Sequence, residues 1–255
     1  MIVIFGALPE EIKYIKKCMS LDKMSVYRHC RIYEGKFDGI DGLLVTTGMG
    51  KKKTILATEY VLNNYPVSLI ISTGFAGGLN NKTTRGDIVV HSDLINENRT
   101  GEESVTDTSL YSDSSLVSVA KRLLINGKYP YLIGKGITVN HAQTTHESKY
   151  KLGVSYLADV VDMESYWIGQ TANEKRVPFI VIRTVLDALN DDLSVLNSIM
   201  SEEKFVPSKA IAYFIKHLSQ IIYVSKLLDD ARKMGKVMAG FIREYIAEIQ
   251  RNECT

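Results

Sequence analysis

The sequence has little that would indicate a secreted, fibrous or membrane-spanning protein. Its 255 residues include only 3 cysteines and 5 prolines. The cysteines are an odd number at wide spacing, which favours neither a disulfide framework nor a paired-cysteine metal site, so we expect a reducing compartment. The longest apolar runs, such as 67–72 and 179–182, are far shorter than the roughly 18 residues that a membrane span needs.

Charge of one sign is also missing. The chain has 31 Lys and Arg against 29 Asp and Glu, a net charge of +2. Such a balance creates no field that would favour nucleic acid as the main partner, so a small molecule is expected. No basic region precedes the first apolar run, as it would in a signal peptide, and we expect an unprocessed cytoplasmic protein.

What is present is an ordinary globular composition, 45% hydrophobic and 24% charged, without repeats or a linker. Short apolar segments alternate with segments of helical period, which predicts an α/β fold with its ligand site at the carboxyl ends of the strands. Strands are expected at 2–5, 27–33, 42–47, 68–73, 87–90, 132–139 and 179–185. Helices are expected at 10–17, 52–64, 116–124, 164–174 and 208–249, and the polar segment 92–115 is expected to be a long loop.

Three acids fall at the carboxyl ends of expected strands and could converge on one crevice. Glu11 lies in the first turn of a helix, where an acid can simply be favoured by the helix dipole. Asp162 and Glu164 lie where a strand meets a helix, and one of them could be only an N-cap. Asp187 lies four residues after Arg183 at the end of an apolar strand, and the two could form an ordinary ion pair.

A glycine-rich loop, Gly74 to Gly78, follows the most apolar expected strand. Glycines there allow a ligand to approach the backbone closely or form a nest for an anion. The loop lacks the spacing of a dinucleotide-binding fingerprint, which disfavours an oxidoreductase.

These segments together resemble a known family. Their order and rough spacing over residues 1–190 are similar to those of the 5′-methylthioadenosine/S-adenosylhomocysteine nucleosidases, which belong to the purine nucleoside phosphorylase/uridine phosphorylase superfamily. The segments are Gly6–Glu11, Gly48–Lys51, Ser72–Leu79, Gly86–Val90, Val161–Glu164 and Arg183–Asp187.

The resemblance implies roles for the three acids. Asp187 matches the acid that promotes protonation of the purine at N7, and we expect its pKa to be raised. Glu164 matches the carboxylate that binds the ribose hydroxyls, and Glu11 matches the base that activates the attacking water. The residues expected to contact substrate are Met49, Gly74, Phe75, Ala76, Ala142, Gln143, Asp162, Met163, Glu164 and Arg183.

The nucleophile can be argued from the same resemblance. Hexameric phosphorylases of the superfamily bind phosphate with two arginines and a serine, and the matching positions here carry Glu10, Ser72 and Phe75. An anion would therefore meet an acid and a phenyl ring, which favours water and hydrolysis.

The chain also departs from the nucleosidase pattern. Those enzymes usually have serines at the positions of Phe75 and Leu186, whose hydroxyls help to hold the catalytic acid. We therefore expect Thr73 or Thr184 to orient Asp187 instead.

The resemblance implies one nucleosidase-like domain over residues 1–255, a three-layer α/β/α sandwich around a mixed, largely parallel twisted sheet, with a divergent helical part from about 191. A homodimer is expected, with no metal and no cofactor. Two alternatives stay open. One is a phosphorylase, because the stretches 162–165 and 187–193 also resemble the hopanoid-associated branch, whose members release adenine from an adenosylated lipid. The other is an inactive nucleoside-binding protein.

Overall fold

The computed structural model describes residues 1–97, 109–194, 200–201, 204–205 and 218–253. The strands are β1 (Ile2–Gly6), β2 (Met19–Tyr27), β3 (Cys30–Phe37), β4 (Ile40–Thr46), β5 (Leu69–Gly78), β6 (Ile88–Asn96), β7 (Leu110–Tyr111), β8 (Tyr131–Thr138), β9 (Val160–Asp162), β10 (Phe179–Asp187), β11 (Met200–Ser201) and β12 (Lys204–Phe205). The helices are α1 (Pro9–Lys16), α2 (Lys51–Asn64), α3 (Ser114–Asn126), α4 (His146–Tyr156), α5 (Ser165–Glu174) and α8 (Leu218–Glu253).

One ten-stranded mixed sheet organises the protein, with the order β10-β6-β8-β9-β5-β1-β4-β3-β2 and with β7 paired to β6. Because β10 also pairs with β5, the strands β5, β10, β6, β8 and β9 close into a ring, and β1 to β4 extend from it as an open sheet. β5 pairs in parallel with both β1 and β10, so the carboxyl ends of these three strands lie at the same edge of the sheet.

Alternation along the strands explains why the sheet is covered on both faces. Ile2 and Ile4 of β1 belong to one buried apolar cluster, while Val3 and Phe5 belong to another. Successive side chains of a strand point to opposite faces, so a strand that is apolar throughout must be buried on both. Helices α1, α3 and α8 supply the first cluster, and α2 and α5 supply the second. The predicted α/β/α layers around a mixed sheet are thereby confirmed.

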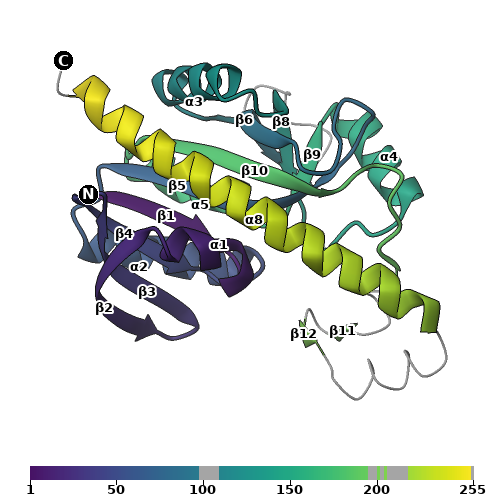
Figure 1. Ribbon diagram of the computed structural model, residues 1–255, viewed down its shortest axis with the longest axis horizontal. Helices are drawn as coiled ribbons and strands as arrows, with labels where there is room; N and C mark the ends of the chain where they lie inside the picture. The colour runs from purple at the N-terminus through teal and green to yellow at the C-terminus, as the bar shows by residue number, and fades with distance from the viewer. Residues whose placement is uncertain (98–108, 195–199, 202–203, 206–217, 254–255) are drawn as a thin grey trace.

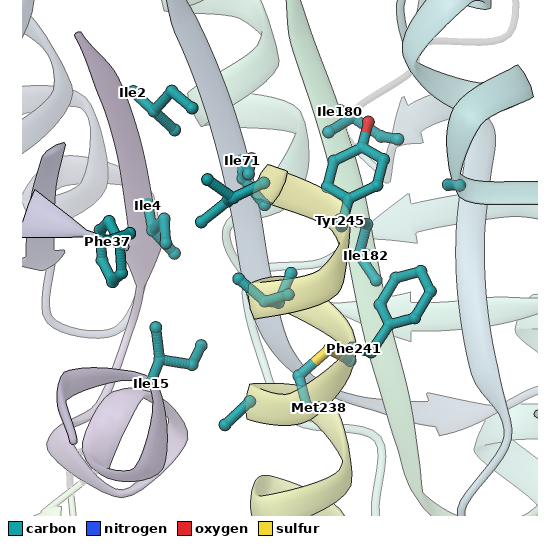
Figure 2. Packing of buried hydrophobic residues seen from close by; sticks show 14 of the residues in the cluster. Ile2, Ile4, Ile15, Phe37, Ile71, Ile180, Ile182, Met238, Phe241 and Tyr245 are labelled. Carbon is teal, nitrogen blue, oxygen red and sulfur yellow. The ribbon is translucent and has the colours of Figure 1, made fainter. Parts of the chain in front are cut away.

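The long helix α8 is the main cover of one face (Figure 1). Figure 2 shows Met238, Phe241 and Tyr245 pointing from α8 towards isoleucines of the sheet. The phenol of Tyr245, buried among these residues, donates a hydrogen bond of 2.9 Å to the carbonyl oxygen of Leu116 in α3. From Met238 onward, one face of the predicted helical tail therefore packs in the core, and the predicted stretch 208–217 lies outside the described residues.

Three local predictions were wrong. The strand expected at 27–33 is interrupted by a turn at Arg28, whose φ is +54°, and β2 before this turn was missed because its side chains are mostly exposed. The segment 92–115 is not one loop, because β6 continues to Asn96 and α3 begins at Ser114; its part 98–108 lies outside the described residues. Helix α4 was missed because its polar sequence has no apolar period.

Within the described residues, no helix has the length and apolarity to cross a bilayer. In the same part of the chain, no group of three or more His, Cys, Asp or Glu side chains is arranged to hold a metal ion.

Candidate active site

A cavity of about 230 Å³ opens at the edge of the sheet where β1, β5 and β10 end. All but two of the residues that the sequence assigned to the site line this cavity: Glu11, Met49, Phe75, Ala76, Ala142, Gln143, Asp162, Met163, Glu164 and Asp187. The carboxylates of three separate segments are thus brought together. The cavity wall is otherwise mainly apolar, and Leu8, Val139, Leu186 and Leu193 contribute to it.

Glu11 is held by the main chain. Its Oε2 accepts hydrogen bonds from the backbone amides of Ala7 (2.7 Å) and Leu8 (2.9 Å), and its Oε1 accepts one from the amide of Phe75 (2.9 Å). Two of these donors precede α1, where unpaired amides make a helix start suited to an anionic group. The acid is buried, and its position is fixed relative to both β1 and β5.

Gly74 does not line the cavity, but it makes this arrangement possible. Its φ is +148°, and a Cβ at this position would collide with the Arg183 guanidinium and with Oε1 of Glu11. Any other residue would therefore displace the carboxylate or the arginine.

Glu164 lies between β9 and α5. Its Oε1 accepts a hydrogen bond of 3.0 Å from the amide of Gly50, at the start of α2. Burial is the main cause that raises the pKa of Glu164 to about 8; Arg183 opposes the shift, and the nearby Glu11 and Asp162 carboxylates add to it. Hydrogen-bond donors placed in the cavity would therefore stabilise the ionised form of Glu164.

Asp162 serves the local chain as well as the cavity wall. Its Oδ1 accepts hydrogen bonds from the amides of Glu164 (3.0 Å) and Ser165 (2.9 Å) and from the hydroxyl of Thr138 (2.8 Å). The capping role that the sequence left open thus belongs to Asp162, which organises the start of α5.

Arg183 lies behind the cavity and is not among the residues that line it. Its fully buried guanidinium donates to the hydroxyl of Ser165 (2.8 Å) and to the carbonyl oxygen of Thr73 (2.9 Å). It also lies 3.4 Å from Oδ2 of Asp162. Arg183 therefore connects β5, β10 and the start of α5, and it forms an ion pair with Asp162.

Asp187 ends β10 and has a partner that the sequence did not identify. The ammonium group of Lys149, on α4, donates a hydrogen bond of 2.8 Å to its Oδ2. Burial raises the pKa of Asp187, as expected, and Lys149 opposes this shift.

The prediction that Thr73 or Thr184 orients Asp187 is wrong. Among the described residues, neither hydroxyl has a hydrogen-bond partner. Both threonines are buried within β5 and β10, before the carboxyl ends of these strands.

The comparisons with known proteins agree with this geometry. The profile of the phosphorylase superfamily matches residues 1–222. The chain belongs to the phosphorylase superfamily.

Within this superfamily, the resemblance to the nucleosidases is confirmed. The chain is similar to the 5′-methylthioadenosine/S-adenosylhomocysteine nucleosidase of Buchnera aphidicola, at 28% identity over 85% of this chain and 96% of the relative. It is also similar to the enzyme of the same name from Bacillus velezensis, at 23% identity over 82% of this chain and 93% of the relative.

Solved structures share the fold of this superfamily member. The nucleosidase of Neisseria meningitidis, in complex with methylthio-immucillin-A, has a TM-score of 0.75 at 22% identity, over 95% of this chain and 98% of that chain. The futalosine hydrolase of Helicobacter pylori has a TM-score of 0.76 at 18% identity, over 97% of both chains.

Proposed function

We propose that the protein hydrolyses the N-glycosidic bond of a 5′-substituted adenosine, of the 5′-methylthioadenosine or S-adenosylhomocysteine type, and releases adenine. The observation that carries the proposal is the convergence of Glu11, Glu164 and Asp187 on one largely apolar cavity, each with a different set of partners. The names of the curated relatives support the same reaction.

The three acids divide the chemistry. Asp187 donates a proton to N7 of adenine, and the bond between the base and the anomeric carbon breaks with its electron pair leaving on the base. Glu164, in its deprotonated form, accepts hydrogen bonds from the ribose hydroxyls and offsets the positive charge on the sugar. Glu11 takes a proton from the attacking water, whose oxygen bonds to the anomeric carbon.

Water is favoured over phosphate by the character of the cavity. Among the described residues that line it, there is no lysine, arginine or histidine. Phosphate recognition in proteins relies on such cations or on free backbone amides, and the amide of Phe75 is already bound by Glu11. A dianion would also face the four acidic side chains that line this mainly apolar cavity, at a high desolvation cost.

Base release tests this proposal directly. The protein is incubated with methylthioadenosine, S-adenosylhomocysteine, adenosine, inosine and futalosine, with and without phosphate, and free base is separated from nucleoside. We expect adenine release from the first two substrates without phosphate. Strict dependence on phosphate would overturn hydrolysis in favour of the phosphorylase alternative, and failure to release base from any nucleoside would refute the proposal and favour the binding alternative.

A homodimer is part of the proposal. Exposed apolar side chains lie on α4, at Tyr150 and Val154, and directly after it, at Leu157, with 53%, 57% and 79% of their surface accessible. Exposed apolar side chains that lie close together on a surface are typical of an interface between subunits. Sedimentation velocity at several concentrations should give the mass of a dimer, and a monomer throughout would contradict this.

A further inference from the structure

Lys149 is a lysine without access to solvent. Its side chain is fully buried, whereas Lys151 on the same helix keeps 71% of its side-chain surface exposed. Lysine is among the residues least often fully buried, because an ammonium group taken from water must be paired at close range. The desolvation cost of burying the Lys149 ammonium group must therefore be offset by its contacts with neighbouring groups.

The ammonium group of Lys149 has three N–H donors, and three oxygen atoms of other residues accept hydrogen bonds from it. Besides Oδ2 of Asp187, it donates to the carbonyl oxygens of Ala188 (2.7 Å) and Asp191 (2.8 Å). All three acceptors lie between the last residue of β10, Asp187, and Asp191. Lys149 thus binds both the carboxylate and the turn that carries it.

The same turn is held from the other side. Oδ2 of Asp191 accepts hydrogen bonds from the amide of Ala188 (2.7 Å) and from the guanidinium of Arg85 (2.7 Å), and Arg85 also bonds to Asp230 of α8 (3.3 Å). The charged groups that act on Asp187 are therefore Lys149 from α4, Asp191 from its own turn and Arg85 from the segment between β5 and β6.

Only one end of this arrangement reaches the cavity. Asp187 lines it, and Lys149 does not. Within the described residues, Oδ2 has a hydrogen-bond partner and Oδ1 has none, so the second oxygen stays available for a ligand. The geometry is that of an acid whose one oxygen is anchored and whose other oxygen is presented.

We propose that Lys149 is a positioning residue for the proposed reaction: it anchors Oδ2 of Asp187 and the turn at 188–191, so that Oδ1 is presented to N7 of the purine. The inference rests on the role proposed for Asp187. It gives the buried cation the task that the absent serine hydroxyls would have had, and it assigns to α4 a part in catalysis without contact to substrate.

The first test is a double-mutant cycle of adenine release with wild type, Lys149→Met, Asp187→Asn and the double variant. We expect Lys149→Met to lower kcat by about 100-fold, the scale of a misplaced catalytic group, with KM changed less than about threefold. In the Asp187→Asn background the same substitution should have no further effect on kcat, because Lys149 acts through Asp187. Multiplying losses, or a wild-type kcat in Lys149→Met, would overturn the proposal.

The second readout is the pH profile of kcat. If Asp187 acts as an acid, activity falls as pH rises through its pKa. Without the ammonium group, burial acts on Asp187 with less opposition, so this fall should move to higher pH in Lys149→Met. A residue needed only for folding would leave the position of the fall unchanged, and that result would contradict the inference.

Matched controls complete the experiment. Lys151→Met removes an exposed lysine two residues away, and its kcat and pH profile should equal those of the wild type. Thermal unfolding is measured for each variant, and Lys149→Gln, which keeps two donors without the charge, replaces Lys149→Met if that variant does not fold. Absence of base release by the wild type would refute the proposed function, whereas wild-type release left unchanged by these variants would refute only the inference.

Discussion

Glu11 and Asp187 line the same cavity, yet the protein holds them in different ways. Three backbone amides bind Glu11, and they come from the turn before α1 and from β5. One buried side chain on α4 binds Asp187. Main-chain donors are independent of residue type, whereas a lysine can be lost by a single substitution. The difference teaches that two acids of one site can depend on the sequence in unequal ways.

The largest expected effect is on the acid that depends on a side chain. Asp187→Asn should lower kcat for adenine release by about 10³-fold, because an amide cannot donate the proton that the leaving base needs. The fold should persist, since the amide oxygen can still accept a hydrogen bond from Lys149. Activity near that of the wild type, with a normal circular dichroism spectrum, would refute the assigned role.

Glu11→Gln should break the other acid differently. A glutamine has one acceptor oxygen for three amide donors, so its NH₂ group would face a backbone N–H and leave it unpaired. We expect a loss of about 100-fold in kcat and also about 1–3 kcal/mol of the free energy of unfolding. Denaturant titration measures the second effect, and an unchanged midpoint would show that the amides do not require the carboxylate.

The buried Glu164 gives a prediction about pH. Its pKa is about 8 in the folded protein and lower in the unfolded chain, so between about pH 4.5 and 8 the folded state binds more protons. The contribution of Glu164 to stability is therefore present at low pH and is lost as pH rises through this window.

The expected loss is on the order of a few kcal/mol. Glu164→Gln removes this titration while keeping an oxygen for the amide of Gly50. Its free energy of unfolding should fall less steeply over the window than that of the wild type, as measured by urea unfolding at several pH values. Parallel curves for the two proteins would contradict the shift.

The smallest expected effect is on stability, and it tests the backbone position Gly74, which lies next to Glu11. Gly74→Ala should destabilise the protein by about 2 kcal/mol, because its positive φ and the nearby Glu11 and Arg183 leave no room for a methyl group. Gly240→Ala on α8 is the control, since a Cβ there would meet no atom within 4 Å and should stabilise the helix by about 0.5–1 kcal/mol. Equal midpoints of thermal unfolding for the two variants would refute the crowding at Gly74.

Sequence reasoning recovered the elements with a strong apolar signal. β1, β5 and β10 are largely apolar, and the carboxyl ends of the expected strands were predicted to bring Glu11, Glu164 and Asp187 to one crevice. It failed where the signal is weak: the exposed strand β2 and the polar helix α4 carry no clear period, and neither was predicted. The missed helix is the one that carries Lys149.

The sequence by itself determined the α/β class, the superfamily and the acids of the site, because these depend on local apolar patterns and on short segments in a fixed order. Tertiary structure alone decided that Arg183 does not line the cavity, that α8 covers one face of the sheet, and that Lys149 binds Asp187. Those facts depend on contacts between residues far apart in the chain, such as Lys149 and Asp187, whose sequence separation is 38. The residue type does not tell whether a charged side chain is exposed to water or buried in the core, because its burial depends on the packing around it.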